Sequence, residues 1–298
     1  MNLRDLKYLV ALADTRHFGK AAERCYVSQP TLSAQIRKLE EYLGVALVER
    51  QPRNVALTAA GEQIVERARR VIRDADDIVE LAHLSRDPLA GKLRIALIPT
   101  IGPYLLPRVM PRLRKALPKL QVMLFEYQTH VLLQKLRAGE IDLGVLALPI
   151  DEDGFDTRRL FHEPFLVAAP ADHRFAKQAS VKPNELAGEK LLLLEDGHCL
   201  RDQALEVCSL LHVDEETDFR ATSLETLRQM VASGMGITLL PQLAAEGPFA
   251  SGKALVTKPF TAPQPGRDVG TVWRRSSTRL PAIEAVNAVL ARAATGKS

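Results

Sequence analysis

Aromatic residues are scarce in this chain of 298 residues: Phe, Tyr and Trp together make up 5%, with a single Trp. The packing of any core must therefore rest on aliphatic side chains. Long hydrophobic runs are also missing, since no stretch of about eighteen apolar residues occurs, and we expect no membrane-spanning helix. The chain is nevertheless long enough for two or three globular domains with cores of their own.

Cysteine is rare as well, with only Cys25, Cys199 and Cys208. The first residues carry charges and lack the apolar core of a secretory signal, so we expect a cytoplasmic protein in a reducing compartment. A disulfide there would be transient. The sequence has no Cys-x-x-Cys pair, and the adjacent His198 and Cys199 are poorly placed to bind one ion together, so we expect no metal and no cofactor.

The net charge of +4 is small but uneven. Residues 1–58 hold nine Lys or Arg against six Asp or Glu, a difference of +3 in about a fifth of the chain. This bias favours a polyanionic partner for the N-terminal part.

Short helical patterns open the chain, and a small hairpin follows them. Ser28 is a predicted N-cap with Pro30 in the first turn behind it, and Gly44 ends the same helix. Two short helices joined by a tight turn, the second strongly capped, are typical of a helix-turn-helix. The helices are predicted over about 3–15, 17–25 and 29–42, and the hairpin over about 46–57.

The outward face of the third helix is polar, with side chains that are able to reach base edges and phosphates in a major groove. An ordinary solvated helix face is the alternative interpretation. Arg50 and Arg53 lie at the tip of the hairpin, where they are able to contact phosphate, and Cys25 is interpreted as a core residue. The polar face comprises Gln29, Thr31, Ser33, Gln35 and Arg37.

A longer helix is predicted from Thr58, its expected cap. Its apolar positions repeat at heptad spacing and its remaining positions are mostly charged, which favours a partner helix, that of a second subunit, over packing on its own domain. Asp87 to Gly91 then breaks the pattern. The heptad positions are Ile64, Ala68, Val71, Ala75, Ile78 and Ala82.

The remaining two hundred or so residues alternate between strand and helix patterns, which predicts a parallel sheet with crossover helices. Ligands of such sheets bind where strands end and helices begin. Thr100 and Thr129 follow the first two predicted strands, and ordinary helix capping is the alternative role, with Thr129 a predicted cap.

Cys199 and Cys208 lie nine positions apart in a stretch of good helix formers. A helix would hold their α-carbons about 13 Å apart, whereas a disulfide needs less than about 7 Å. The two thiols therefore pair only if the segment unwinds, as in a redox switch. His198, Arg201 and the start of a helix would favour the Cys199 thiolate. Two inert, buried cysteines remain the alternative.

The N-terminal motifs resemble the LysR-type family of bacterial transcriptional regulators. They are Ser-Gln-Pro-Thr-Leu-Ser at 28–33, Gln-Ile-Arg-Lys-Leu-Glu at 35–40, Leu-Gly-Val at 43–45, Arg50 and Leu-Thr at 57–58. The resemblance implies a winged helix-turn-helix at 1–58, a linker dimerisation helix at 59–87, and a regulatory domain similar to periplasmic binding proteins at 88–298. That domain would have two α/β subdomains, about 88–162 with 268–298 and about 163–267.

Further blocks resemble the peroxide-sensing members of this family; they lie at 97–107, 128–130, 194–204 with Cys208, and 219–227. The resemblance implies that hydrogen peroxide oxidises Cys199 and that Cys208 then forms a disulfide with it. Thr100, Thr129 and His198 would hold the peroxide. An arginine of the 264–268 loop would join them, and we place it at Arg267.

The resemblance also implies partners. Promoter DNA would be contacted by Arg4, Gln29, Pro30, Thr31, Ser33, Arg37 and Arg53. The chain would form a homodimer or homotetramer, contact RNA polymerase, activate antioxidant genes and be reset by a cellular thiol reductant. We expect no enzymatic activity and no membrane partner.

Two other functions are compatible with the residues. One is a LysR-type regulator that binds a small organic effector in the same cleft and carries structural cysteines; unreactive thiols would favour it. The other is a thiol peroxidase, against which the helix-turn-helix argues.

Overall fold

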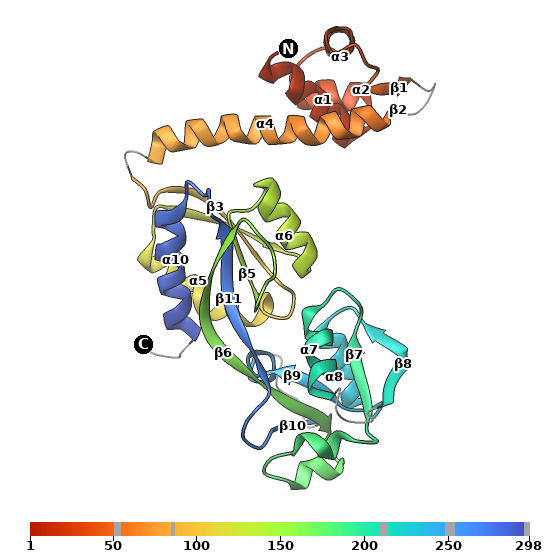
Figure 1. The fold of residues 1–298 in the computed structure, drawn as a ribbon, viewed down its shortest axis with the longest axis vertical. Coiled ribbons are helices and arrows are strands. Elements are labelled where there is room, and N and C mark those ends of the chain that lie inside the picture. Colours follow the sequence, from red (N-terminus) through yellow and green to blue (C-terminus); the bar gives the residue numbers. More distant parts are fainter. Residues whose placement is uncertain (51–54, 85–86, 209–213, 248–253, 295–298) are drawn as a thin grey trace. The chain divides into compact units, whose positions relative to one another are not determined.

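The computed structural model describes residues 1–50, 55–84, 87–208, 214–247 and 254–294. The chain divides into two compact units, Met1–Arg86 and Asp87–Ser298 (Figure 1). Within the described residues, no helix is long and apolar enough to cross a membrane.

The first unit is a winged helix-turn-helix, as predicted. The Asn2 side chain accepts from the backbone of Arg4 and Asp5 to start the first helix. Ser28 Oγ accepts from the Thr31 backbone and Gly44 closes the third helix in the left-handed conformation, so local capping sets these ends. The elements are α1 Leu3–Thr15, α2 Phe18–Arg24, α3 Gln29–Leu43, β1 Val48–Arg50, β2 Val55–Leu57 and α4 Ala59–Leu84.

Aliphatic side chains of α1 and α3 form the core of this unit. Leu9, Leu12, Leu32 and Ile36 are fully buried. Cys25 is the C-cap residue of α2; it is half-buried and packs against this core. Burial raises the pKa of its thiol. That position agrees with its interpretation as a core residue.

The helix α4 has two different halves. Val65 and Ala68 are buried, and Val65 belongs to the core of the unit. Ile64 also packs against that core, so the predicted heptad seam begins as an intramolecular contact. Farther along, Val71 and Ile78 are 46% and 67% exposed. The outer part of the seam is therefore an uncovered apolar face within this unit.

The sheet of the second unit is mixed rather than parallel, which corrects the expectation from sequence. Among the described strands of the seven-stranded sheet, only β3 Gly91–Leu97, β4 Leu120–Glu126 and β5 Leu143–Leu148 are parallel to one another. The long strands β6 Phe155–Pro170 and β11 Gly266–Arg274 are antiparallel, and β11 also pairs antiparallel with β5. The order is β10-β6-β11-β5-β3-β4, with β9 also on β6.

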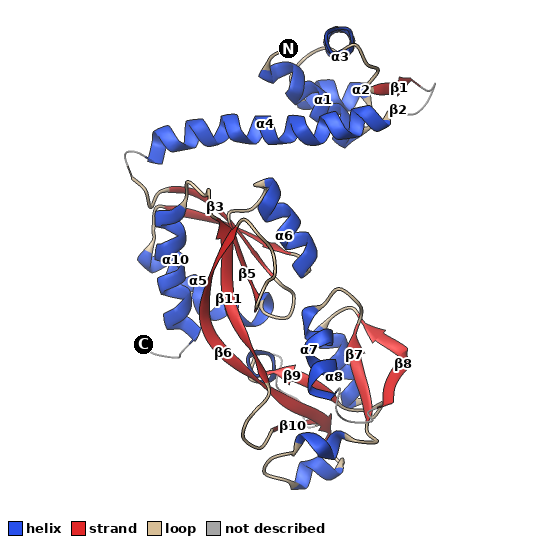
Figure 2. Ribbon diagram, viewed as in Figure 1, coloured by secondary structure: helices blue, strands red, loops and turns tan. Residues whose placement is uncertain are grey.

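Helices cover this sheet, and a smaller parallel pair of strands, β7 and β8, lies in the outer part of the unit (Figure 2). The strands are β7 Lys190–Leu194, β8 Asp214–Ala221, β9 Thr238–Pro241 and β10 Leu255–Pro259. The helices are α5 Gly102–Ala116, α6 Thr129–Ala138, α7 Cys199–Cys208, α8 Leu224–Ala232, α9 Gln242–Ala245 and α10 Leu280–Ala294, with short 3-10 helices η1 Arg174–Lys177 and η2 Pro183–Leu186.

The long strands β6 and β11 of the second unit pair along the whole length of β11, with one shift of register between Val269 and Gly270 (Figure 1). The chain crossings that the family resemblance implies, near 162 and 267, fall inside these strands. One pair of their ladder is Glu163 opposite Arg267. Both positions thus lie in one antiparallel pair of strands.

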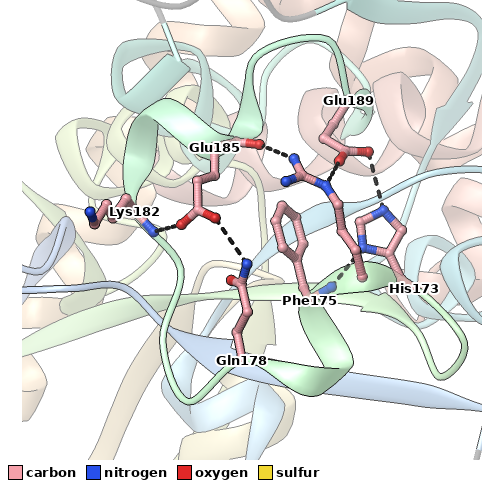
Figure 3. A network of polar contacts seen from close by, with 7 residues as sticks. His173, Phe175, Gln178, Lys182, Glu185 and Glu189 are labelled. Carbon is pink, nitrogen blue, oxygen red and sulfur yellow. Dashed lines mark hydrogen bonds and ion pairs between the residues drawn. The ribbon is translucent and has the colours of Figure 1, made fainter.

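A polar network fastens the segment between β6 and β7 (Figure 3). Glu189 accepts from Arg174 Nε at 2.8 Å and lies 3.2 Å from His173 Nε2. Glu185 accepts from Gln178 at 2.9 Å and from the backbone of Lys182 at 2.8 Å. These bonds anchor the chain directly before β7, the strand that leads to Cys199.

Candidate functional site

Cys199 is the first residue of α7, and its thiol is free and half-buried. It follows β7 through a short turn in which Gly197 has φ +93°. A side chain at that glycine would be strained and would meet the Gln128 amide oxygen at 2.8 Å. The turn thus places the sulfur at the positive end of a helix, where negative charge is stabilised.

Three of the expected peroxide contacts surround that sulfur. Thr100, Thr129, His198 and Cys199 line one tightly packed pocket together with Gln128. The threonines follow the ends of β3 and β4, His198 lies in the turn before α7, and Cys199 is the first residue of that helix. Residues about 100 positions apart in sequence therefore meet at one thiol.

The threonine hydroxyls are not helix caps. Thr129 is the first residue of α6, behind Gln128 at the N-cap position, and no side chain caps this end. The prediction that Thr129 caps the helix is therefore wrong, and Thr129 lines the pocket instead. Thr100 precedes α5, whose N-cap position is Ile101 and which also has no side-chain cap.

Arg267 reaches the site from β11. Its Nη1 donates to Thr100 Oγ1 at 2.8 Å and its Nη2 donates to the Thr100 carbonyl at 3.0 Å. Its Nε donates to Glu163 at 2.8 Å. Thr100, Glu163 and Arg267 are 2%, 2% and 3% exposed, so this is a buried ion pair beside the pocket.

His198 does not supply the positive charge that the sequence suggested. The ring is 5% exposed, and burial lowers its pKa, while Glu195 acts in the opposite direction. At pH 7 the imidazole is therefore neutral and acts through hydrogen bonding. Its Nε2 lies 3.3 Å from Gln128 Nε2.

Arg201 is engaged elsewhere. Its Nε pairs with Asp196 at 2.9 Å, and Nη1 donates to the Leu194 carbonyl. Asp196 and Glu163 thus offset the charges of Arg201 and Arg267 respectively. Hydrogen bonds and the helix end, rather than an unpaired cation, define the polarity around the sulfur.

A larger cavity of about 740 Å³ adjoins the same cysteine. Its lining includes Cys199, Thr129 and Gln203, together with residues 265–268 at the start of β11. Asp268 accepts from Arg159 and contacts His162, and these hydrogen bonds lower the pKa of its carboxyl. The cavity gives small molecules a route to the thiol.

Cys208 is the last residue of α7, and its side chain lies outside the described part of the structure. The helix between the two cysteines is continuous over Cys199–Cys208, and its rise puts their α-carbons about 13 Å apart. The separation inferred from the sequence therefore holds for the backbone of this form.

The predicted DNA-binding residues lie on one helix, with two exceptions. Gln29, Thr31 and Arg37 are exposed on α3, and Pro30 is exposed in its first turn. Ser33 is half-buried on the same helix. Arg4 is exposed in the first turn of α1, and Arg53 lies outside the described residues.

Sequence reasoning missed Gln128 and Glu163. Gln128 stands directly before Thr129, and that adjacency was a usable signal. Glu163 gave no signal, because its partner lies 104 positions away and is brought to it only by the register of two strands.

Comparison with known families places the chain in a defined class of bacterial regulators. Residues 3–62 match the bacterial regulatory helix-turn-helix protein model of the lysR family, and residues 86–295 match the LysR substrate binding domain. The chain therefore belongs to the LysR family of transcriptional regulators.

Similar proteins are more specific. The chain is 52% identical over 277 residues to the "DNA-binding transcriptional dual regulator OxyR" of Escherichia coli K12, covering 93% of this chain and 90% of that protein. It is 45% identical to the "Hydrogen peroxide-inducible genes activator" of Haemophilus influenzae, covering 93% and 92%.

Solved structures agree. Full-length OxyR of Pseudomonas aeruginosa, a C199D form, matches with TM-score 0.76 and 44% identity, covering 97% of this chain and 94% of that one. The oxidised form of OxyR matches with TM-score 0.64 and 47% identity, covering 70% of this chain and 99% of that one.

Proposed function

We propose that this chain is a hydrogen-peroxide-responsive LysR-type regulator that activates antioxidant genes. The observation that carries the proposal is the pocket in which Thr100, Thr129 and His198 surround the free thiol of Cys199 at the start of a helix. The high identity to regulators named for hydrogen peroxide supports it.

The chemistry has two steps. The Cys199 thiolate attacks one peroxide oxygen, the O–O bond breaks, and the product is a sulfenic acid plus hydroxide, which takes up a proton and leaves as water. The Cys208 thiolate then attacks the sulfenic sulfur, the S–O bond breaks, and the hydroxide that leaves takes up a proton to give a second water as the disulfide forms. Two thiols are oxidised and one peroxide is reduced.

The pocket residues orient the peroxide in the first step. The Thr100 and Thr129 hydroxyls and the neutral His198 ring are hydrogen-bonding groups at the thiol. Arg267 acts through Thr100, which it contacts twice. In this role they bring the attacked oxygen toward the sulfur and stabilise the leaving hydroxide.

The second step requires α7 to unwind, because about 13 Å between α-carbons exceeds the disulfide limit of about 7 Å. Loss of this helix is a two-state event that repacks the regulatory unit. The exposed face of α4 at Val71 and Ile78 would join subunits into a homodimer or homotetramer.

The remaining partners follow from the same role. The exposed face of α3, with Arg4 and Arg53, would contact promoter DNA. RNA polymerase would receive the signal, and a cellular thiol reductant in the cytoplasm would reset it. The chain would act as a regulator and not as an enzyme. The rate of peroxide consumption in the presence of a reductant should therefore not exceed the rate at which the disulfide is reduced.

The substitution Cys199→Ser tests the proposal. The variant should bind operator DNA but lose the peroxide-dependent shift of its footprint, because no sulfenic acid forms. Mass spectrometry of the peroxide-treated wild type should find a peptide cross-linked within 197–208. An unchanged footprint shift in the variant would remove the mechanism.

The 740 Å³ cavity favours one alternative, an organic effector bound beside Cys199. Titration of the thiols with peroxide separates the two functions. A Cys199 that does not react at submicromolar peroxide, about 10⁻⁷ to 10⁻⁶ M, would favour the effector.

A further inference from the structure

Glu163 is buried, and each of its two carboxylate oxygens accepts a hydrogen bond. Oε2 accepts from Arg267 Nε at 2.8 Å, and Oε1 accepts from the Leu243 backbone N–H at 2.9 Å. The exposed fractions of the Glu163 and Arg267 side chains are 1% and 0%. Strand β6, strand β11 and helix α9 therefore meet at one carboxylate.

This arrangement is unlike an ordinary stabilising contact. Burying two charges costs desolvation energy that their attraction only partly offsets, so a buried ion pair is weak support for stability alone. The pair is also not needed to join β6 to β11, because the backbone ladder already runs through Glu163 and Arg267. A role in the neighbouring pocket accounts for it better.

The contact with Thr100 indicates that role. A threonine hydroxyl has one hydrogen to donate and two lone pairs that accept. Arginine only donates hydrogen bonds, so Thr100 Oγ1 accepts from Arg267 Nη1 through one of its lone pairs. The hydroxyl hydrogen of Thr100 is not used in this bond. Thr100 lines the Cys199 pocket, so that hydrogen is available to a molecule bound beside the sulfur.

We propose that Glu163 is a positioning residue for the reaction at Cys199: it holds Arg267 against Thr100, so that Thr100 donates its hydroxyl hydrogen to the bound peroxide. The inference rests on the proposed peroxide reaction. Glu163 itself touches neither the sulfur nor the peroxide.

The substitution Glu163→Gln is sharp because it is nearly isosteric. An amide has one acceptor oxygen, and its nitrogen donates. It is therefore able to satisfy Arg267 or the Leu243 N–H but not both, and Arg267 loses its counter-charge. Glu284→Gln is the matched control, because Glu284 accepts from Arg158 of the same strand β6 at an exposed pair.

The measurement compares two reactions of the Cys199 thiol in the full-length protein. Rapid-quench mass spectrometry of the Cys199 peptide gives its rate with hydrogen peroxide and its rate with iodoacetamide across a pH series. Iodoacetamide needs the thiolate but no donor from Thr100. We expect E163Q to slow the peroxide reaction about tenfold or more. The rate of alkylation at high pH, where the thiolate is fully formed, should change by less than about threefold. E284Q should match the wild type in both.

A double-mutant cycle with Thr100→Val adds a second readout. If Glu163 acts through Thr100, E163Q with T100V should be no slower with peroxide than T100V alone, within about twofold. Glu163→Asp keeps the charge and both acceptor oxygens on a shorter side chain, and it should recover part of the rate that E163Q loses. If E163Q lacks a cooperative unfolding transition, E163D carries the test in its place.

The outcomes are distinguishable. A peroxide rate in E163Q equal to that of E284Q, additive effects in the cycle, or a parallel loss of peroxide reaction and alkylation would each overturn the inference while leaving the peroxide sensor intact. A wild-type Cys199 that does not react with peroxide would overturn the proposed function and this inference with it.

Discussion

The Gln128 amide nitrogen lies 3.3 Å from Nε2 of His198, and this contact joins the end of β4 to the residue directly before Cys199. A neutral imidazole has one donor nitrogen and one acceptor nitrogen. Because burial lowers the pKa of His198, its ring is neutral at pH 7. Gln128 therefore selects the tautomer and holds the plane of a ring that lines the thiol pocket.

Replacing Gln128 with leucine should slow the reaction of Cys199 with peroxide about fivefold, the value of one hydrogen bond of about 1 kcal/mol. The rate is measured by quenching and mass spectrometry of the Cys199 peptide. The nitrogen chemical shifts of the His198 ring should change at the same time. Gln121→Leu, at an exposed position of β4, is the control. Equal rates in both variants would show that the contact does not matter.

The buried His198 also makes the regulatory unit sensitive to acid. Its folded pKa lies below the ordinary value of 6.5, so between these two values the unfolded chain binds a proton that the folded chain does not. The contribution of neutral His198 to the free energy of unfolding is therefore fully present above about pH 6.5. It is lost as the pH falls toward and through the folded pKa of the ring.

Urea unfolding of wild type and His198→Gln at a fixed protein concentration measures this effect. The stability of the wild type should fall more steeply than that of the variant as the pH is lowered from about 7.5 to 5. The difference between the curves isolates His198 from the other histidines. Parallel curves would mean that the ring titrates normally in the folded state.

Local signals explain what the sequence predicted well. Ser28, Pro30 and Gly44 sit at the ends of α3, where capping acts within a few residues, so its bounds were predicted to within one residue. The helix over Cys199–Cys208 followed in the same way from good helix formers without Gly or Pro.

Long-range register explains what the sequence did not predict. The first half of β6 carries no strand signal in the sequence, because it is charged, with Arg158 and Arg159, and mostly half-buried or exposed. The antiparallel β11 and the Glu163–Arg267 pair depend on that missing half. The lowered pKa of His198 was not predictable for a related reason, since it depends on burial by residues distant in sequence.

The exposed face of α3 predicts a salt-dependent contact at Arg37. Arg37→Ala should weaken binding to the promoter fragment that the wild type protects. It should also reduce the slope of log affinity against log salt by about 1, because one fewer counterion is released. Arg137→Ala removes the same charge from the regulatory unit and should leave the slope unchanged. Identical slopes for R37A and wild type would place Arg37 away from phosphate.

The stability of α7 should control how fast the second thiol reaches the first. Glu206 is exposed near the end of this helix, so alanine and glycine at that position differ mainly in helix propensity, by about 1 kcal/mol. If the disulfide forms only after α7 unwinds, Glu206→Gly should convert sulfenic acid to disulfide about fivefold faster than Glu206→Ala.

The formation of the sulfenic acid, which precedes the disulfide, provides the internal control. Sulfenic acid formation needs Cys199 in its folded pocket, so the two Glu206 variants should form it at the same rate. Rapid-quench trapping with dimedone counts the sulfenic acid, and non-reducing mass spectrometry counts the disulfide in the same samples. Equal disulfide rates in both variants would mean that unwinding of the helix at Glu206 does not limit how fast the cysteines meet. In that case the separation of about 13 Å would close by unwinding at another part of the helix, or after a slower step that precedes unwinding.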